Sequence, residues 1–139
     1  MGQPKTLSAN ELRRVAGVWG KQYQTVQWHS TQLVVRHSLG INEYISLIRS
    51  IVADCSPKDG EVAYELFDFS VRLNVVLAYA FVDLPEDIES AFYILYNSDL
   101  YDTVRKYVNT AQIDAAIESA ERIVGESAGE VRRICHHKT

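Results

Sequence analysis

Apolar residues recur at helical spacing over most of positions 41–124. In residues 41–55 they follow each other at intervals of three and four, the pattern of an amphipathic helix. Residues 63–80 contain few charges and are apolar nearly all round in their second half, which predicts a central helix covered from several sides. Further helices are predicted to begin at Asp83–Glu86, at Ser98 and at Thr110. We therefore expect a bundle of four or five helices over 41–124.

The aromatic residues of this region are predicted to lie mostly in the core. The group includes Phe69 in the central helix and Tyr93 in the helix after Pro85, and most of its members, without a choice among them, are expected to be core. The apolar residues of that later helix fall at intervals of three and four, so we expect them to form one buried stripe. These stripe residues are Ile88, Ala91, Phe92, Leu95 and Tyr96.

A shorter helix is predicted ahead of the bundle, at residues 8–20. Ser8 and Glu11 have the spacing of a capping box at its start, and Gly20 is a plausible end. Its apolar side chains fall on one face and are Leu12, Val15, Ala16 and Trp19. The segment is an accessory N-terminal helix whose packing partner the pattern does not identify.

Residues 24–37 carry the clearest strand signal. Two runs rich in β-branched and aromatic residues, 25–28 and 31–36, flank His29-Ser30 and predict a β-hairpin. Because a lone hairpin is marginally stable in water, it must pack against the helices. The predicted fold is α+β and mainly α, a single domain over 1–139 with an N-terminal hairpin packed on the bundle.

Composition supports a soluble, cytoplasmic protein. The 139 residues are 47% hydrophobic, contain two cysteines and have a net charge of −4. No segment approaches the roughly 20 apolar residues of a membrane span, and the N-terminus lacks a secretory pattern.

Acidic residues are concentrated in 61–121, a segment that contains twelve acidic and three basic residues. Such a field disfavours nucleic acid and favours a basic protein partner, although a solvated face that maintains solubility is the preferred interpretation.

Candidate chemistry is sparse. Cys135, His136 and His137 are metal-ligand types, but one short run cannot close a tetrahedral site, so a frayed basic tail over 125–139 is the preferred interpretation. Cys55 lies on an apolar stripe, where a thiol is buried and inert. We therefore predict no enzyme, no cofactor and no metal.

The short helix and the hairpin are the region with the weakest predicted packing. Aromatic residues with one polar end are common at protein interfaces, and both tryptophans lie here. The predicted interface residues are Trp19, Trp28, His29, Leu33, Val35 and Arg36.

Residues 28–124 contain a dispersed pattern of packing and turn positions and no catalytic signature. The pattern consists of Trp28, the run Gln32–Leu39, Glu43, Cys55, Lys58–Glu61, Glu65–Arg72, Tyr79-Ala80, Leu84-Pro85, Tyr96–Asp99, Asn109 and Gln112–Asp114. In this pattern the chain resembles small proteins encoded among the virion genes of tailed phages and prophages of gut Firmicutes.

The resemblance implies a role in phage morphogenesis. A hairpin followed by an acidic helical bundle is similar to tail assembly chaperones, which keep the tape-measure protein soluble, and to head–tail connectors or other neck components. It implies a phage structural protein as partner, self-association and the host bacterial cytoplasm as location. The alternative is a small phage inhibitor of a bacterial defence system, whose acidic face at 61–121 occupies a basic groove.

Overall fold

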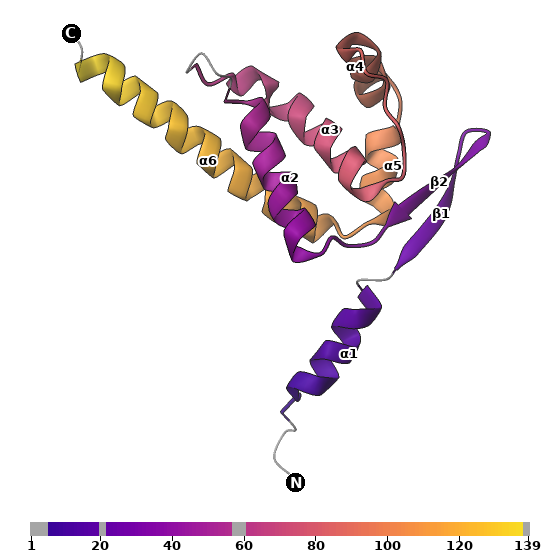
Figure 1. Cartoon of the computed structure of the whole chain (residues 1–139). Helices are drawn as coiled ribbons and strands as arrows, with labels where there is room; N and C mark the ends of the chain where they lie inside the picture. Colours follow the sequence, from indigo (N-terminus) through magenta and orange to yellow (C-terminus); the bar gives the residue numbers. More distant parts are fainter. Residues whose placement is uncertain (1–5, 20–21, 57–60, 138–139) are drawn as a thin grey trace.

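The computed structural model describes residues 6–19, 22–56 and 61–137, with side chains described up to residue 127. A two-stranded sheet and five helices form the body of the molecule, and a sixth helix extends from it (Figure 1). The elements are α1 (Ala9–Trp19), β1 (Tyr23–Trp28), β2 (Thr31–Arg36), α2 (Ile41–Asp54), the 3-10 turn η1 (Tyr64–Leu66), α3 (Phe67–Tyr79), α4 (Ile88–Asn97), α5 (Leu100–Tyr107) and α6 (Thr110–His137).

The predicted hairpin and its turn are confirmed. β1 and β2 pair antiparallel, with Trp28 opposite Thr31 across the turn. His29 has a φ of 54°, the sign that a tight two-residue turn requires at its first position. The sheet is extended at the end of α3, where Ala80 forms a bridge with Val35 and the Phe81 amide donates to the Val34 carbonyl at 2.9 Å. The hairpin is therefore joined to the bundle by backbone hydrogen bonds as well as by packing.

The fold class is α+β and mainly α, as predicted. α2 packs against both α3 and α6, and α3 also contacts α4 and α5 (Figure 1). One hydrophobic core joins the hairpin to the helices. Its completely buried members include Val35, Ile51, Val75, Tyr79, Leu95, Val104 and Ile113.

Two predicted helix starts need correction. The central segment begins as a 3-10 turn at Tyr64, and regular α-helix starts only at Phe67. The next helix does not start at Asp83–Glu86 but at Ile88. Asp87 precedes it with extended backbone, and its Oδ2 accepts a hydrogen bond from the Ser90 amide at 2.9 Å. The Ser90 hydrogen bonds lower the pKa of Asp87, as expected for a carboxylate at a helix start.

The predicted tail at 125–139 is also corrected. α6 continues through Gly125 and ends at His137. Gly125 and Gly129 each cost a helix interior only about 1 kcal/mol, and the neighbouring glutamates and alanine favour helix, so the segment stays helical. The side chains of Cys135, His136 and His137 lie outside the described residues.

The accessory helix forms as predicted. The Ser8 hydroxyl accepts a hydrogen bond from the Glu11 amide at 3.2 Å, which caps the start of α1. None of the described side chains of α1 is buried. The helix extends away from the rest of the molecule below the hairpin (Figure 1).

Candidate functional site

The six residues predicted to form an interface do not share one surface. Leu33 and Val35 point into the core, where they are 4% and 0% exposed, so their prediction as interface residues is wrong. The alternation of a strand puts every second residue on one face, and here that face covers the bundle. Trp19 is exposed and belongs to α1, a different element from the strand that contains Leu33 and Val35.

Trp28 and His29 lie at the tip of the hairpin against the start of α5. The Trp28 indole donates a hydrogen bond to Asp99 Oδ1 at 2.8 Å. His29 Nε2 lies 3.5 Å from the same oxygen, and its ring meets the indole edge-on. This contact holds the hairpin tip to the bundle, and whether the pair also meets a partner stays a prediction.

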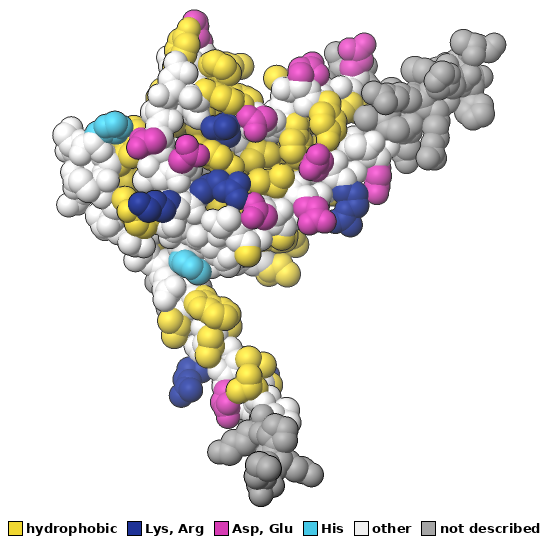
Figure 2. Space-filling view, turned by 180° about the vertical axis from the view of Figure 1, so that it is seen from behind, with side chains coloured by type: hydrophobic (Ala, Val, Ile, Leu, Met, Phe, Trp, Pro, Cys, Tyr) yellow, Lys and Arg dark blue, Asp and Glu magenta, His cyan; other side chains and the backbone are white. Residues whose placement is uncertain are grey.

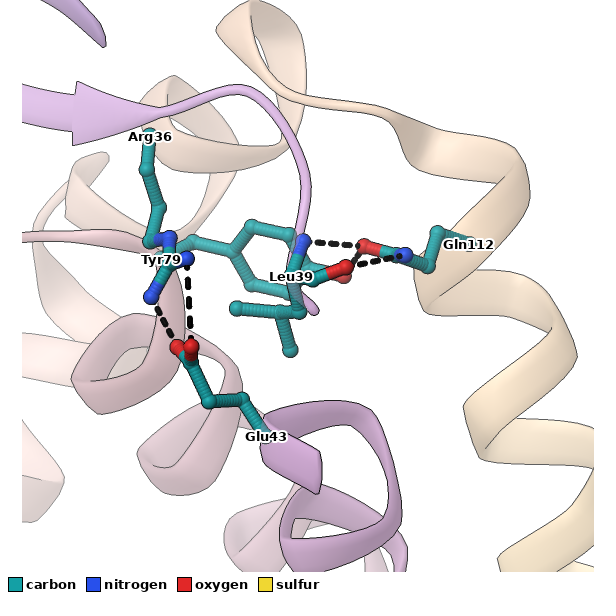
Figure 3. Close-up of polar contacts among 5 residues, drawn as sticks. All are labelled: Arg36, Leu39, Glu43, Tyr79 and Gln112. Atoms are coloured by element: carbon teal, nitrogen blue, oxygen red, sulfur yellow. Dashed lines mark hydrogen bonds and ion pairs between the residues drawn. The ribbon is translucent and has the colours of Figure 1, made fainter. Parts of the chain in front are cut away.

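Arg36 belongs to a polar junction between β2, α2, α3 and α6 (Figure 3). Its guanidinium pairs with Glu43. Beside it, the Gln112 amide accepts from the Leu39 amide at 2.8 Å and donates to the Leu39 carbonyl at 3.1 Å. The Tyr79 hydroxyl donates to the same Gln112 oxygen at 2.6 Å. The polar groups of Gln112, Leu39 and Tyr79 satisfy one another, whereas Arg36 Nε is buried without a hydrogen-bond partner among the described residues. The Gln112 contacts tie α3, α6 and the segment after β2 together, as a structural junction does.

A mainly apolar surface lies elsewhere, between α3 and α4. A groove of about 820 Å³ runs between η1, the first half of α3 and one face of α4. Its apolar lining is Leu66, Phe69, Leu73, Ile88, Phe92, Tyr93 and Tyr96. Figure 2 shows apolar side chains gathered over the upper part of the molecule, among acidic ones. We call this surface the aromatic groove.

Stacked rings form the centre of the aromatic groove. The Phe92 and Tyr96 rings stack at 4.6 Å between centroids, and Phe69 lies parallel to Tyr96 at 6.4 Å. Leu66, Phe69 and Leu73 follow the spacing i, i+3, i+7, so they form one line along the opposite wall. The rings support each other, and the groove therefore offers a preformed apolar surface.

The groove corrects the prediction of a fully buried stripe on α4. Ala91 and Leu95 are buried as expected, but Ile88 is 74% exposed and Phe92 is 45% exposed. Tyr93, one of the aromatic residues that were predicted to be mostly core, is 52% exposed. The apolar arc of α4 is wider than the surface that α3 and α5 cover, and the surplus side chains line the groove. The sequence signal for the groove was this excess of apolar residues among the ten positions of α4.

Carboxylates surround the apolar lining. Asp54, Glu65 and Glu89 are the acidic residues of the groove wall, and no described basic residue lines it. Asp54 Oδ2 accepts hydrogen bonds from Ser70 Oγ at 2.7 Å and from Asn74 Nδ2 at 3.0 Å, which fix it in place. The site therefore combines an apolar floor with a negative rim.

Tyr96 links the groove to Asp68, a carboxylate that does not line it. Its hydroxyl donates to Asp68 Oδ2 at 2.5 Å, and the Arg72 guanidinium lies 4.4 Å from the centre of its ring. Burial, followed by the hydrogen bond to Asp68, raises the pKa of Tyr96 to about 12. The hydroxyl stays protonated at neutral pH, so the ring is held as an apolar wall and offers no base.

Reactive groups are not concentrated at the groove. Cys55 is completely buried, and burial, together with Asp54 and Glu65, raises the pKa of its thiol. In the part of the chain that the structure describes, no group of three potential metal ligands comes together. An apolar lining with carboxylates at its edge is suited to binding an apolar partner segment.

Comparison of the chain with family models, curated proteins and solved structures finds no match. Within the described residues, no helix has the length and apolar character that crossing a membrane requires. The chemistry of the aromatic groove is therefore the main guide to function.

Proposed function

We propose that this protein is a non-enzymatic assembly protein of a tailed phage, acting through protein–protein contacts in the host bacterial cytoplasm. The most specific form of the proposal is a tail assembly chaperone whose partner is the tape-measure protein or another tail or neck protein. The aromatic groove carries the proposal, because a preformed apolar surface with exposed rings is suited to covering an apolar helix of a partner. The phage origin is proposed on the resemblance of residues 28–124 to proteins of the phage virion region.

The groove's chemistry defines the partner segment. Helices that bind in grooves insert apolar side chains spaced i, i+3, i+4 and i+7. Glu65 and Glu89 favour lysine or arginine at the edges of that helix, and they oppose the phosphates of nucleic acid. The expected partner segment is an amphipathic helix with basic flanks.

The test is capture from phage-producing host cells with the tagged protein, followed by mass spectrometry. We expect wild type to retain a virion structural protein and Phe92→Ala to lose it. Leu77→Ala is the matched control, since Leu77 is 47% exposed, against 45% for Phe92, and does not line the groove. Removing a central aromatic anchor costs about 2 kcal/mol or more of binding free energy.

The outcomes separate the two functional classes. Capture of a tape-measure or neck protein that depends on Phe92 supports the chaperone. Capture of a host nuclease or defence complex supports the alternative, a phage inhibitor that uses its acidic face at 61–121. Retention of neither class by wild type contradicts both.

A further inference from the structure

The helix α1 is a second uncovered apolar surface on the same chain. Leu12 and Trp19 are each 54% exposed and Val15 is 41% exposed. Figure 2 shows this apolar stripe along the projecting helix. An isolated helix of eleven residues is marginal in water, even with a capped start. α1 therefore requires a packing partner that its own body does not provide.

The spacing of that stripe fits the aromatic groove. Its four apolar residues are Leu12, Val15, Ala16 and Trp19, which follow i, i+3, i+4 and i+7. This is the anchor pattern of helices that bind in apolar grooves. The groove offers a matching line of side chains on α3 and stacked rings on α4.

The charges are complementary as well. α1 contains Arg13 and Arg14 against the single acid Glu11, so it has a net positive charge. The groove wall presents Asp54, Glu65 and Glu89. Opposite charges around an apolar contact steer association and fix its orientation.

Within one copy, α1 is attached near the end of α3 that lies away from the aromatic groove, so the groove that it can bind is that of another molecule. Tyr23, at the start of β1, packs against Phe81 with ring centroids 5.7 Å apart. Phe81 follows the C-terminal end of α3, whereas Leu66 and Phe69 of the groove lie at its N-terminal end, about 20 Å away along the helix. α1 points away from that groove (Figure 1).

We propose that α1 of one copy binds in the aromatic groove of a second copy. The proposal rests on the proposed function only in using the same groove as a helix-binding surface. We call α1 the arm. Each copy offers one arm and one aromatic groove, so the contact closes as a reciprocal dimer or continues as a ring. The arm then covers the groove until a partner helix displaces it.

The test measures the molar mass of the purified full-length protein by sedimentation velocity. We expect wild type to self-associate, and Val15→Asp in the arm or Ile88→Asp in the groove to weaken association by roughly thirtyfold or more, the size of a hot-spot loss. Both side chains are exposed, so each variant should retain the circular dichroism and unfolding midpoint of the folded bundle. Ile41→Asp is the matched control, since Ile41 is 75% exposed, against 74% for Ile88, and lies outside the groove.

Mixing the two variants is the decisive measurement. Val15→Asp retains an intact groove and Ile88→Asp retains an intact arm, so the mixture should form a one-to-one complex that neither variant forms alone. A monomeric wild type, or a mixture that stays monomeric, would overturn the proposal. Equal loss of association in the Ile41→Asp control would also overturn it.

Failure here is distinct from failure of the proposed function. The measurement uses purified protein without a partner, so a monomeric wild type rejects only the arm contact. Self-association without capture of a virion or defence protein rejects only the functional proposal.

Discussion

At the scale of single residues, the junction around Gln112 shows how one side chain joins distant segments. Its amide satisfies both backbone groups of Leu39 and also accepts from Tyr79, which is completely buried on α3. A buried polar group without a partner costs about 1–3 kcal/mol, so the mutual pairing of Gln112, Leu39 and Tyr79 avoids that cost for each of them. The junction thus fixes the linker between β2 and α2 against α6.

Tyr79 provides a pH-dependent test of this junction. Burial raises the pKa of its hydroxyl above the ordinary value of 10.0, with a further contribution from Tyr44. Tyr79 therefore stabilises the fold fully below pH 10.0, and this contribution is lost as the pH rises toward the folded-state pKa. We expect Tyr79→Phe to cost about 1 kcal/mol at neutral pH and to reduce the loss of stability above pH 10.0.

Urea unfolding of wild type and Tyr79→Phe across this pH range measures both effects. Identical alkaline slopes for the two proteins would show that Tyr79 ionises in the folded state as freely as in the unfolded chain. That result would contradict its placement in the core.

At the scale of elements, the hairpin is held at both ends. The Ala80 bridge extends the sheet near the base of β2, and Trp28 bonds to Asp99 at the tip. A two-stranded hairpin needs such support, since alone it is marginal in water. The tip contact joins β1 to the start of α5, two elements that are far apart in the sequence.

A double-mutant cycle tests the tip contact. Trp28→Phe keeps an aromatic ring but removes the indole N–H, and Asp99→Ala removes the acceptor. We expect each single variant to lose about 1 kcal/mol of unfolding free energy and the double variant to lose less than the sum of the two. Strict additivity in urea unfolding would mean that the two side chains do not interact in solution.

At the scale of the whole molecule, uncovered apolar surface is divided between the arm and the aromatic groove. Both surfaces follow from element faces that the body of one copy leaves uncovered. Large exposed apolar surfaces on a folded protein mark interaction sites. The two proposals therefore use the same groove, one for a partner helix and one for a second copy.

Amide hydrogen exchange reports whether α1 is docked in a groove or free in solution. We expect the α1 amides to exchange slowly in wild type, where the arm is docked, and rapidly in Ile88→Asp, where the groove no longer accepts it. Amides of α3 should be equally protected in both proteins, because the core around Val75 does not depend on the arm. Equal, rapid exchange of α1 in both proteins would contradict docking.

Much of the fold could be predicted from local pattern. The hairpin turn at His29-Ser30, the cap at Ser8 and the burial of Cys55 each depend on neighbouring residues or on one helical face, so the sequence contains the necessary information. The prediction of a fully buried α4 stripe was wrong because burial depends on the elements packed beside a helix, which periodicity does not reveal. The interface prediction was wrong for Leu33 and Val35 for the same reason.

The sequence by itself therefore determined the types of the elements, most of their order and the sign of the charge over 61–121. Only the tertiary structure decided which apolar faces are covered, and hence that Ile88 and Phe92 line a groove. It also decided that Gln112 meets Tyr79 and Leu39. The physical reason is that spacing is a property of one segment, whereas coverage depends on the angles and distances between segments that fold together.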